Sequence, residues 1–196
     1  MLKMEYNYTL KNENVDYGFV KGNDKIVLVK PGLGGNYTGY ENKYLKIAHQ
    51  LNERYGCSVI VASNPEGSRN HAKSDKQILE QYISENNITS PELFFFGNSN
   101  GGIKGLELTN NAVAFKKMVL VNMPLMLNFH KTKRYISATP QTEIVAIYGQ
   151  HDQSVPYLPF LDGKFENVKV LTVPNADHNF KGMLDEFISL SDCLME

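Results

Sequence analysis

One segment of the chain, Gly97-Asn98-Ser99-Asn100-Gly101, places a serine between two glycines. The pattern Gly-x-Ser-x-Gly is typical of a sharp turn from a strand into a helix, which exposes the serine hydroxyl. Residues 93–96 (LFFF) form the apolar run expected of the strand, and residues 100–110 are predicted to form the helix. The glycines leave room where side chains would collide. The segment predicts a nucleophilic Ser99, with a surface serine in an ordinary tight turn as the alternative.

A serine hydroxyl becomes a good nucleophile only when a neighbouring base accepts its proton. His178 follows a predicted strand at residues 168–173, so it is expected at the same end of a parallel sheet as Ser99. The other histidines lie in a predicted helix, in polar or charged segments, or beside a better acid candidate: His49, His71, His130 and His151. Position along the chain therefore predicts His178 as the base.

A carboxylate is needed to hold the histidine in the right tautomer and to stabilise its charged form. Asp152 follows the predicted strand at residues 144–148. The other usual position, after the predicted strand at residues 118–121, holds Asn122, which has no carboxylate. Asp177 directly precedes His178, and adjacent side chains rarely turn back on each other, so we expect a solvated loop acid there. Asp152 is the predicted acid.

The elements that must position these residues alternate along the chain. Short apolar or β-branched runs predict strands, and apolar residues at helical spacing predict helices. The predicted strands are residues 6–10, 15–20, 25–29, 58–62, 93–96, 118–121, 144–148 and 168–173, and the predicted helices are residues 40–55, 75–85, 100–110 and 181–194. This alternation predicts an α/β fold with a mostly parallel central sheet and helices on both faces, in a single domain spanning residues 1–196.

The composition argues against several classes of protein. The 196 residues are 42% hydrophobic and 21% charged, with a net charge of -1, so no basic surface for nucleic acid or anionic membranes is expected. The two cysteines, Cys57 and Cys193, form no metal-binding pattern, and we expect neither a metal nor another cofactor. No signal peptide or membrane-spanning run is found, which makes the cytoplasm the expected location. The oligomeric state is left open.

In their order along the chain, Ser99, Asp152 and His178 resemble the catalytic triad of the α/β-hydrolase superfamily. Two segments add to the resemblance, which extends from about residue 25 to the end. Residues 149–156 (GQHDQSVP) are similar to the Gly-x-x-Asp-x-x-Val-Pro acid loop, and residues 177–180 (DHNF) are similar to the histidine loop. The resemblance implies an α/β-hydrolase fold and a serine hydrolase that cleaves esters or thioesters through an acyl-enzyme at Ser99.

The glycine-rich loop after residues 25–29 is the expected second half of an oxyanion hole in this superfamily. Its donor would be the backbone N–H of Leu33. The Asn100 N–H, at the N-terminus of the helix, would donate to the same oxyanion. The chain has Pro31-Gly32 where the family often has His-Gly, which matters little for a backbone donor. The loop matches the dinucleotide pattern Gly-x-Gly-x-x-Gly only in part, because Tyr37 occupies the third glycine position.

The connection at residues 122–143 is too short for a lid domain, so we expect an open site. Small acyl esters or thioesters are the expected ligands, with short acyl chains preferred. Apolar residues of this connection, and tyrosines from neighbouring loops, are expected to contact the substrate: Tyr37, Met123, Leu125, Met126 and Tyr157. An acyltransferase with the same triad and a non-catalytic binding protein on this fold remain alternatives.

Overall fold

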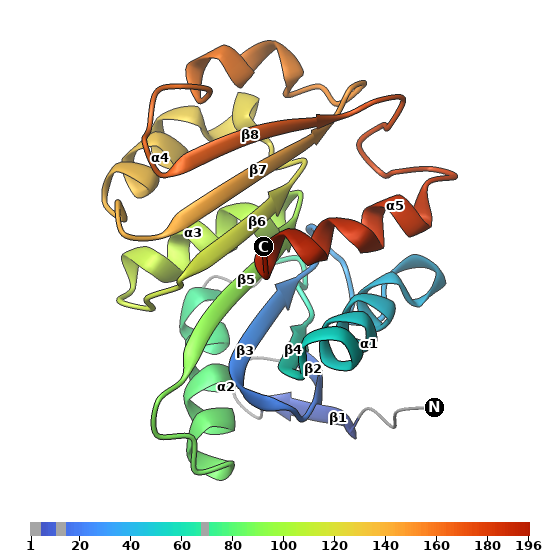
Figure 1. The fold of residues 1–196 in the computed structure, drawn as a ribbon, viewed down its shortest axis with the longest axis vertical. Helices are drawn as coiled ribbons and strands as arrows, with labels where there is room; N and C mark the ends of the chain where they lie inside the picture. The colour runs from blue at the N-terminus through green and yellow to red at the C-terminus, as the bar shows by residue number, and fades with distance from the viewer. Residues whose placement is uncertain (1–4, 11–14, 68–70) are drawn as a thin grey trace.

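The computed structural model of the chain describes residues 5–10, 15–67 and 71–196. Its centre is an eight-stranded sheet in the order β1-β2-β4-β3-β5-β6-β7-β8 (Figure 1). The strands are β1 (Glu5–Leu10), β2 (Val15–Val20), β3 (Asn23–Lys30), β4 (Cys57–Ala62), β5 (Glu92–Asn98), β6 (Lys117–Val121), β7 (Glu143–Gly149) and β8 (Val168–Val173). Neighbouring strands from β4 to β8 are parallel, whereas β2 pairs antiparallel with β1 and β4. The predicted, mostly parallel sheet is confirmed.

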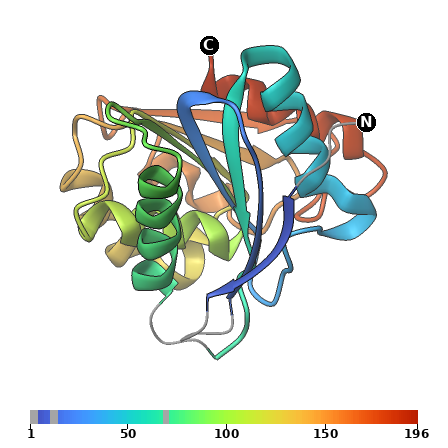
Figure 2. The same ribbon diagram turned by 90° about the horizontal axis from the view of Figure 1, so that it is seen from below.

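Helices cover both faces of this sheet (Figure 2). On one face lie α2 (His71–Glu85), α3 (Asn100–Asn110) and α4 (Leu125–Ser137), and on the other lie α1 (Lys43–Tyr55), α5 (Leu184–Ser189) and the 3-10 helix η3 (Leu190–Leu194). Two further 3-10 helices are η1 (Tyr40–Asn42) and η2 (Val155–Phe160). In β3, Ile26 and Leu28 face α2 and α3, whereas Val27 and Val29 face α1. Burial on both faces explains the continuous apolar runs of the central strands.

Two predicted helices begin later in the structure than the sequence suggests. The helix predicted at residues 40–55 is regular only from the start of α1, because Glu41 and Asn42 have positive φ angles of 48° and 57°. The helix predicted at residues 181–194 is α5 followed by η3, because Phe180 and Gly182 have φ angles of 53° and 74°. Residues in this left-handed region cannot continue a right-handed helix. Both irregular turns lie beside the site described below.

The connection between β6 and β7 contains one helix, α4, which is not among the predicted elements. In the part of the chain that the structure describes, no large lid domain covers the sheet, as expected from the length of this connection. None of the helices within the described ranges has the length and apolar character needed to cross a bilayer. The same residues contain no group of three or more His, Cys, Asp or Glu side chains that could hold a metal ion.

Candidate active site

Ser99 occupies a strained turn between β5 and α3. Its φ and ψ of 52° and -124° lie outside the regions that L-residues normally adopt. A Cβ at Gly97 would lie 2.7 Å from the backbone nitrogen of Gly102. A Cβ at Gly101 would lie 2.2 Å from the carbonyl oxygen of Lys30. A side chain at either position would collide with the backbone. The turn therefore requires both glycines, as the Gly-x-Ser-x-Gly pattern predicts.

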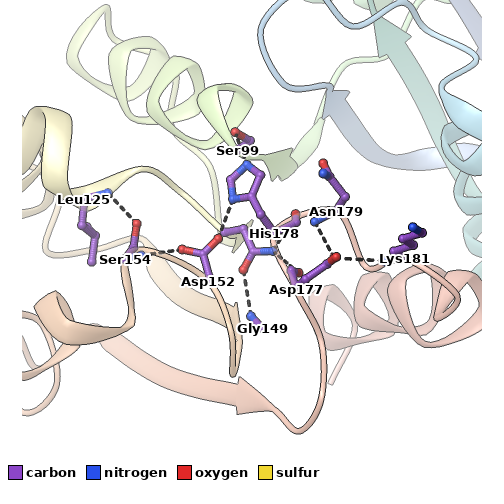
Figure 3. A network of polar contacts seen from close by, with 10 residues as sticks. Ser99, Leu125, Gly149, Asp152, Ser154, Asp177, His178, Asn179 and Lys181 are labelled. Atoms are coloured by element: carbon purple, nitrogen blue, oxygen red, sulfur yellow. Dashed lines mark hydrogen bonds and ion pairs between the residues drawn. The ribbon is translucent and has the colours of Figure 1, made fainter.

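The three residues with predicted chemistry meet at the carboxyl end of the sheet (Figure 3). Ser99 follows β5, Asp152 follows β7 and His178 follows β8. The His178 Nε2 lies 3.0 Å from Ser99 Oγ, and the Nδ1 lies 2.5 Å from Asp152 Oδ2. An ionised carboxylate can only accept a hydrogen bond, so Nδ1 carries the proton and Nε2 accepts from the Ser99 hydroxyl. This geometry allows the imidazole to take the proton of Ser99 as its oxygen attacks an electrophile.

The two partners of this histidine–carboxylate pair differ in exposure. Only 1% of the Asp152 side chain is exposed, against 42% of the His178 side chain. The second carboxylate oxygen of Asp152 accepts the Ser154 N–H at 2.7 Å, which restricts its rotation. The Ser154 Oγ accepts the Leu125 N–H at 3.2 Å, so the acid loop is also linked to the start of α4. A buried and restrained acid can orient the ring of a histidine that stays accessible to ligand and water.

Asp177 precedes His178 but points away from the imidazole (Figure 3). Its carboxylate accepts the backbone N–H groups of Asn179 and Lys181 at 2.9 and 3.0 Å. The hydrogen bond from the Lys181 N–H is the main reason that the pKa of the Asp177 carboxyl lies below its ordinary value. Asp177 therefore stabilises the turn of the histidine loop and leaves the contact with the ring to Asp152.

Asn122, set aside in the sequence because it lacks a carboxylate, connects the loops of the site. It is fully buried after β6. Its Nδ2 donates to the carbonyl oxygens of Asp177 and His178 at 3.2 and 2.9 Å, and its Oδ1 accepts the Gly149 N–H at 2.8 Å. One amide thus ties the histidine loop to Gly149, where β7 ends and the acid loop begins. The sequence does contain a signal for this role. Asn122, whose amide can both donate and accept hydrogen bonds, occupies the alternative position of the acid after the strand at residues 118–121.

The loop after β3 lies against the serine turn. A Cβ at Gly32 would be 3.3 Å from the Cβ of Ser99. Within the described residues, no hydrogen bond uses the backbone N–H of Leu33 or of Asn100. Both predicted oxyanion donors are therefore free to donate to a ligand oxygen. That the Leu33 and Asn100 N–H groups point toward the same ligand oxygen remains a prediction.

Two buried side chains that are not among the predicted site residues hold this loop and the serine turn together. Asn64, after β4, donates through Nδ2 to a carbonyl of the loop at 2.9 Å and to Asn100 Oδ1 at 3.2 Å. The Tyr44 hydroxyl accepts the Asn98 Nδ2 at 3.1 Å and also contacts the backbone of Gly32. Burial raises the pKa of Tyr44 to about 12, so this phenol stays protonated. Side chains distant in sequence therefore fix the spacing of the two segments.

A cleft of about 570 Å³ opens at Ser99 and His178. Its walls come from the loop after β3 and from the start of α1, and include Leu33, Tyr40 and Lys43. Leu33 and Tyr40 are 59% and 76% exposed, so the site is open. The openness agrees with the absence of a large lid over the described part of the sheet.

The structure corrects the predicted substrate contacts at Met123 and Leu125. Both side chains are fully buried in the core. Met123 packs against α3, where a Cβ added at Gly102 would lie 3.3 Å from the Met123 Cβ. Neither residue lines the cleft at Ser99. The physical reason is that the chain turns into α4 at Pro124, which directs these apolar side chains inward instead of toward a ligand.

The remaining predicted contacts also lie outside this cleft. Met126 and Tyr157 line a separate groove of about 610 Å³ formed by α4 and η2, which includes none of the three residues of the candidate triad. Tyr37 is half-buried, and its N–H donates to Ser63 Oγ at 3.0 Å. Contact of these three side chains with a substrate remains a prediction that the lining of the cleft does not support.

Comparison with known protein families and with curated proteins finds no match to the chain. Among solved structures, Est1E from Butyrivibrio proteoclasticus is similar, with a TM-score of 0.70, 11% identity, and coverage of 98% of this chain and 97% of that one. A putative α/β hydrolase from Agrobacterium tumefaciens has a TM-score of 0.74, 13% identity, and coverage of 98% and 95%. An α/β serine hydrolase without a lid from Xanthomonas campestris has a TM-score of 0.64, 14% identity, and coverage of 91% and 87%. The strand order, the serine turn and these likenesses agree: the chain has the α/β-hydrolase fold.

Proposed function

We propose that the chain is a serine hydrolase that cleaves an ester or thioester through an acyl-enzyme formed on Ser99. The observation that carries the proposal is the continuous hydrogen-bond chain from Asp152 through His178 to Ser99, with distances of 2.5 and 3.0 Å. The similar structure from Xanthomonas campestris is a serine hydrolase, which supports the class of enzyme.

In the first half-reaction, Ser99 Oγ attacks the carbonyl carbon while His178 Nε2 accepts the hydroxyl proton. The N–H groups of Leu33 and Asn100 donate hydrogen bonds to the oxyanion of the tetrahedral intermediate. His178 then protonates the leaving alcohol or thiol, the C–O or C–S bond breaks, and the acyl group stays on Ser99. Asp152 stabilises the charged imidazole in each of these steps.

In the second half-reaction, a water molecule attacks the acyl carbon and gives a proton to His178. That proton returns to Ser99 Oγ as the acyl–oxygen bond breaks, which releases the carboxylic acid and restores the enzyme. With 42% of its side chain exposed, His178 is accessible to water from the open cleft. Water can therefore reach the acyl-enzyme, as hydrolysis requires.

The test combines turnover of p-nitrophenyl acetate with labelling by a fluorophosphonate probe. Ser99→Ala and His178→Ala should each lower kcat/KM by about a thousandfold or more, since nucleophile and base act as a unit. Asp152→Asn should lower kcat by about a hundredfold or more, because an amide no longer holds the required tautomer. The probe should label the wild type and not Ser99→Ala.

Asp177→Asn is the matched comparison, because its amide oxygen can still accept the Lys181 N–H. It should have a much smaller effect than Asp152→Asn. Retention of most activity by Ser99→Ala contradicts the proposal. Collapse of activity in Asp177→Asn, with normal activity in Asp152→Asn, transfers the role of the acid to Asp177.

A further inference from the structure

A second cavity, of about 470 Å³, adjoins the cleft at Ser99 on the side of α1 and α5. The cleft and this second cavity share Tyr40, Lys43 and Asn179 in their linings. Much of the lining of the second cavity is apolar, from Phe180, Leu184 and Phe187. A ligand whose reacting group lies at Ser99 can therefore extend past Lys43 into apolar surroundings.

Lys43 lies at the junction of the cleft and the second cavity. It is the one lysine or arginine among the described residues that lines the cleft, and no Asp or Glu lines it. The Lys43 Nζ lies 4.4 Å from the centre of the Phe187 ring and 5.0 Å from that of the Tyr44 ring. Over residues 5–10, 15–67 and 71–196, no carboxylate forms an ion pair with it.

The electrostatic surroundings of Lys43 leave its charge uncompensated. The side chain is half-buried, and this burial lowers the pKa of its ammonium group. Aromatic faces attract an ammonium group only modestly. A partly desolvated cation gains more from an anion that shares its surroundings. A ligand anion at the junction would supply that partner.

The other charged residues near the second cavity favour an anion at the junction over one placed deeper. Glu41, Asp177 and Lys181 line the second cavity but not the cleft. Beyond Lys43, the lining of the second cavity holds two carboxylates, Glu41 and Asp177, against the one ammonium of Lys181, which disfavours an anion placed deeper in it. The anionic part of a ligand therefore fits beside Lys43, and its apolar part fits against the aromatic lining.

We propose that the ester cleaved at Ser99 carries a carboxylate that pairs with the Lys43 ammonium, and an apolar group that enters the second cavity. The inference rests on the proposed function, since it names the substrate class of the same site. One ammonium matches the charge of one carboxylate. A charge-assisted hydrogen bond of this kind contributes about tenfold to a hundredfold in affinity.

The first experiment compares two p-nitrophenyl esters of equal length, the pentanoate and the monoester of glutaric acid, which differ in a terminal methyl or carboxylate. The measured quantity is the ratio of kcat/KM for the anionic over the neutral ester. Lys43→Met should lower this ratio by about tenfold or more. Lys43→Arg should keep it within about threefold of the wild type. Lys46→Met, an exposed lysine of the same helix outside the cleft, is the matched control and should keep the wild-type ratio.

The second experiment measures binding without turnover. Ser99→Ala is titrated calorimetrically with 4-phenylbutyrate and with its neutral counterpart 4-phenylbutanamide. The carboxylate should bind about tenfold more tightly, and the difference should vanish in the Ser99→Ala, Lys43→Met double variant. A melting curve for each variant verifies that it is folded.

The outcomes separate this inference from the proposed function. Ser99-dependent turnover of the neutral ester, with an unchanged ratio in Lys43→Met, overturns the inference and leaves the proposed function standing. Equal affinities for the carboxylate and the amide also overturn it. Tighter, Lys43-dependent binding of the carboxylate without turnover of any ester upholds the anion site and contradicts the hydrolase.

Discussion

Replacing Asn122 by glycine removes three hydrogen bonds that join the histidine loop to β7. Two of them hold the carbonyl oxygens of Asp177 and His178, and the third holds the Gly149 N–H. Glycine is the suitable replacement, because Asn122 has a φ of 48° that glycine adopts without strain. Alanine would add a backbone cost of about 1 kcal/mol. The glycine variant therefore isolates the loss of the side-chain amide.

The expected size of the effect follows from the burial of these groups. Each hydrogen bond contributes about 1 kcal/mol net, so the free energy of unfolding should fall by about 3 kcal/mol. For a chain of this length, such a loss lowers the melting temperature by roughly 6 to 12 °C. The His178 carbonyl also loses its anchor, which lets the ring move relative to Ser99. The kcat for p-nitrophenyl acetate should therefore fall by about tenfold to a hundredfold, with a smaller change in KM.

Urea unfolding and steady-state kinetics measure the two effects of Asn122→Gly. Asn175→Gly is the matched control, because Asn175 lies between β8 and the histidine loop, is exposed, and has a similar φ of 61°. The control should change the free energy of unfolding by less than about 0.5 kcal/mol. A wild-type unfolding midpoint together with a wild-type kcat in Asn122→Gly would contradict this role of Asn122, because the amide would then hold neither loop.

The remaining predictions concern pH and the length of the acyl chain. The kcat/KM for p-nitrophenyl acetate should rise as the pH is raised from acid to neutral, because Nε2 of His178 must be unprotonated to accept the Ser99 proton. A flat profile over this range contradicts a histidine base. In a series of p-nitrophenyl esters, short acyl chains should react fastest, because the connection between β6 and β7 holds α4 and no lid domain. A maximum at long chains contradicts the open site.

The strands and the order of the candidate triad were predictable because local patterns determine them. A strand buried on both faces needs a continuous apolar run, and β8 has the same bounds in the structure as in the prediction. Ser99, Asp152 and His178 each follow a strand of one parallel sheet. The carboxyl ends of parallel strands share an edge, so their meeting there follows from the strand assignment alone.

The residues that contact the substrate were not predictable in the same way. Apolar residues after β6 can line a cleft or pack in the core, and their residue types are the same in both cases. The turn into α4 buries Met123 and Leu125. The helices α1 and α5 begin later than predicted, after Asn42 and Gly182 with their positive φ angles. Lys43 therefore lies beside the cleft and the second cavity.

Patterns along the chain were enough to predict the α/β architecture, the serine turn and the residues of the candidate triad. The side chains that support them were not predictable, because their contacts join segments that are distant in the sequence. The hydrogen bond from Asn122 to the His178 carbonyl spans 56 residues, and that from Asn64 to Asn100 spans 36. The residue type alone does not distinguish an asparagine in a solvated loop from one at a buried junction between segments. Its role depends on the segments that folding places next to it, which no pattern around the residue records.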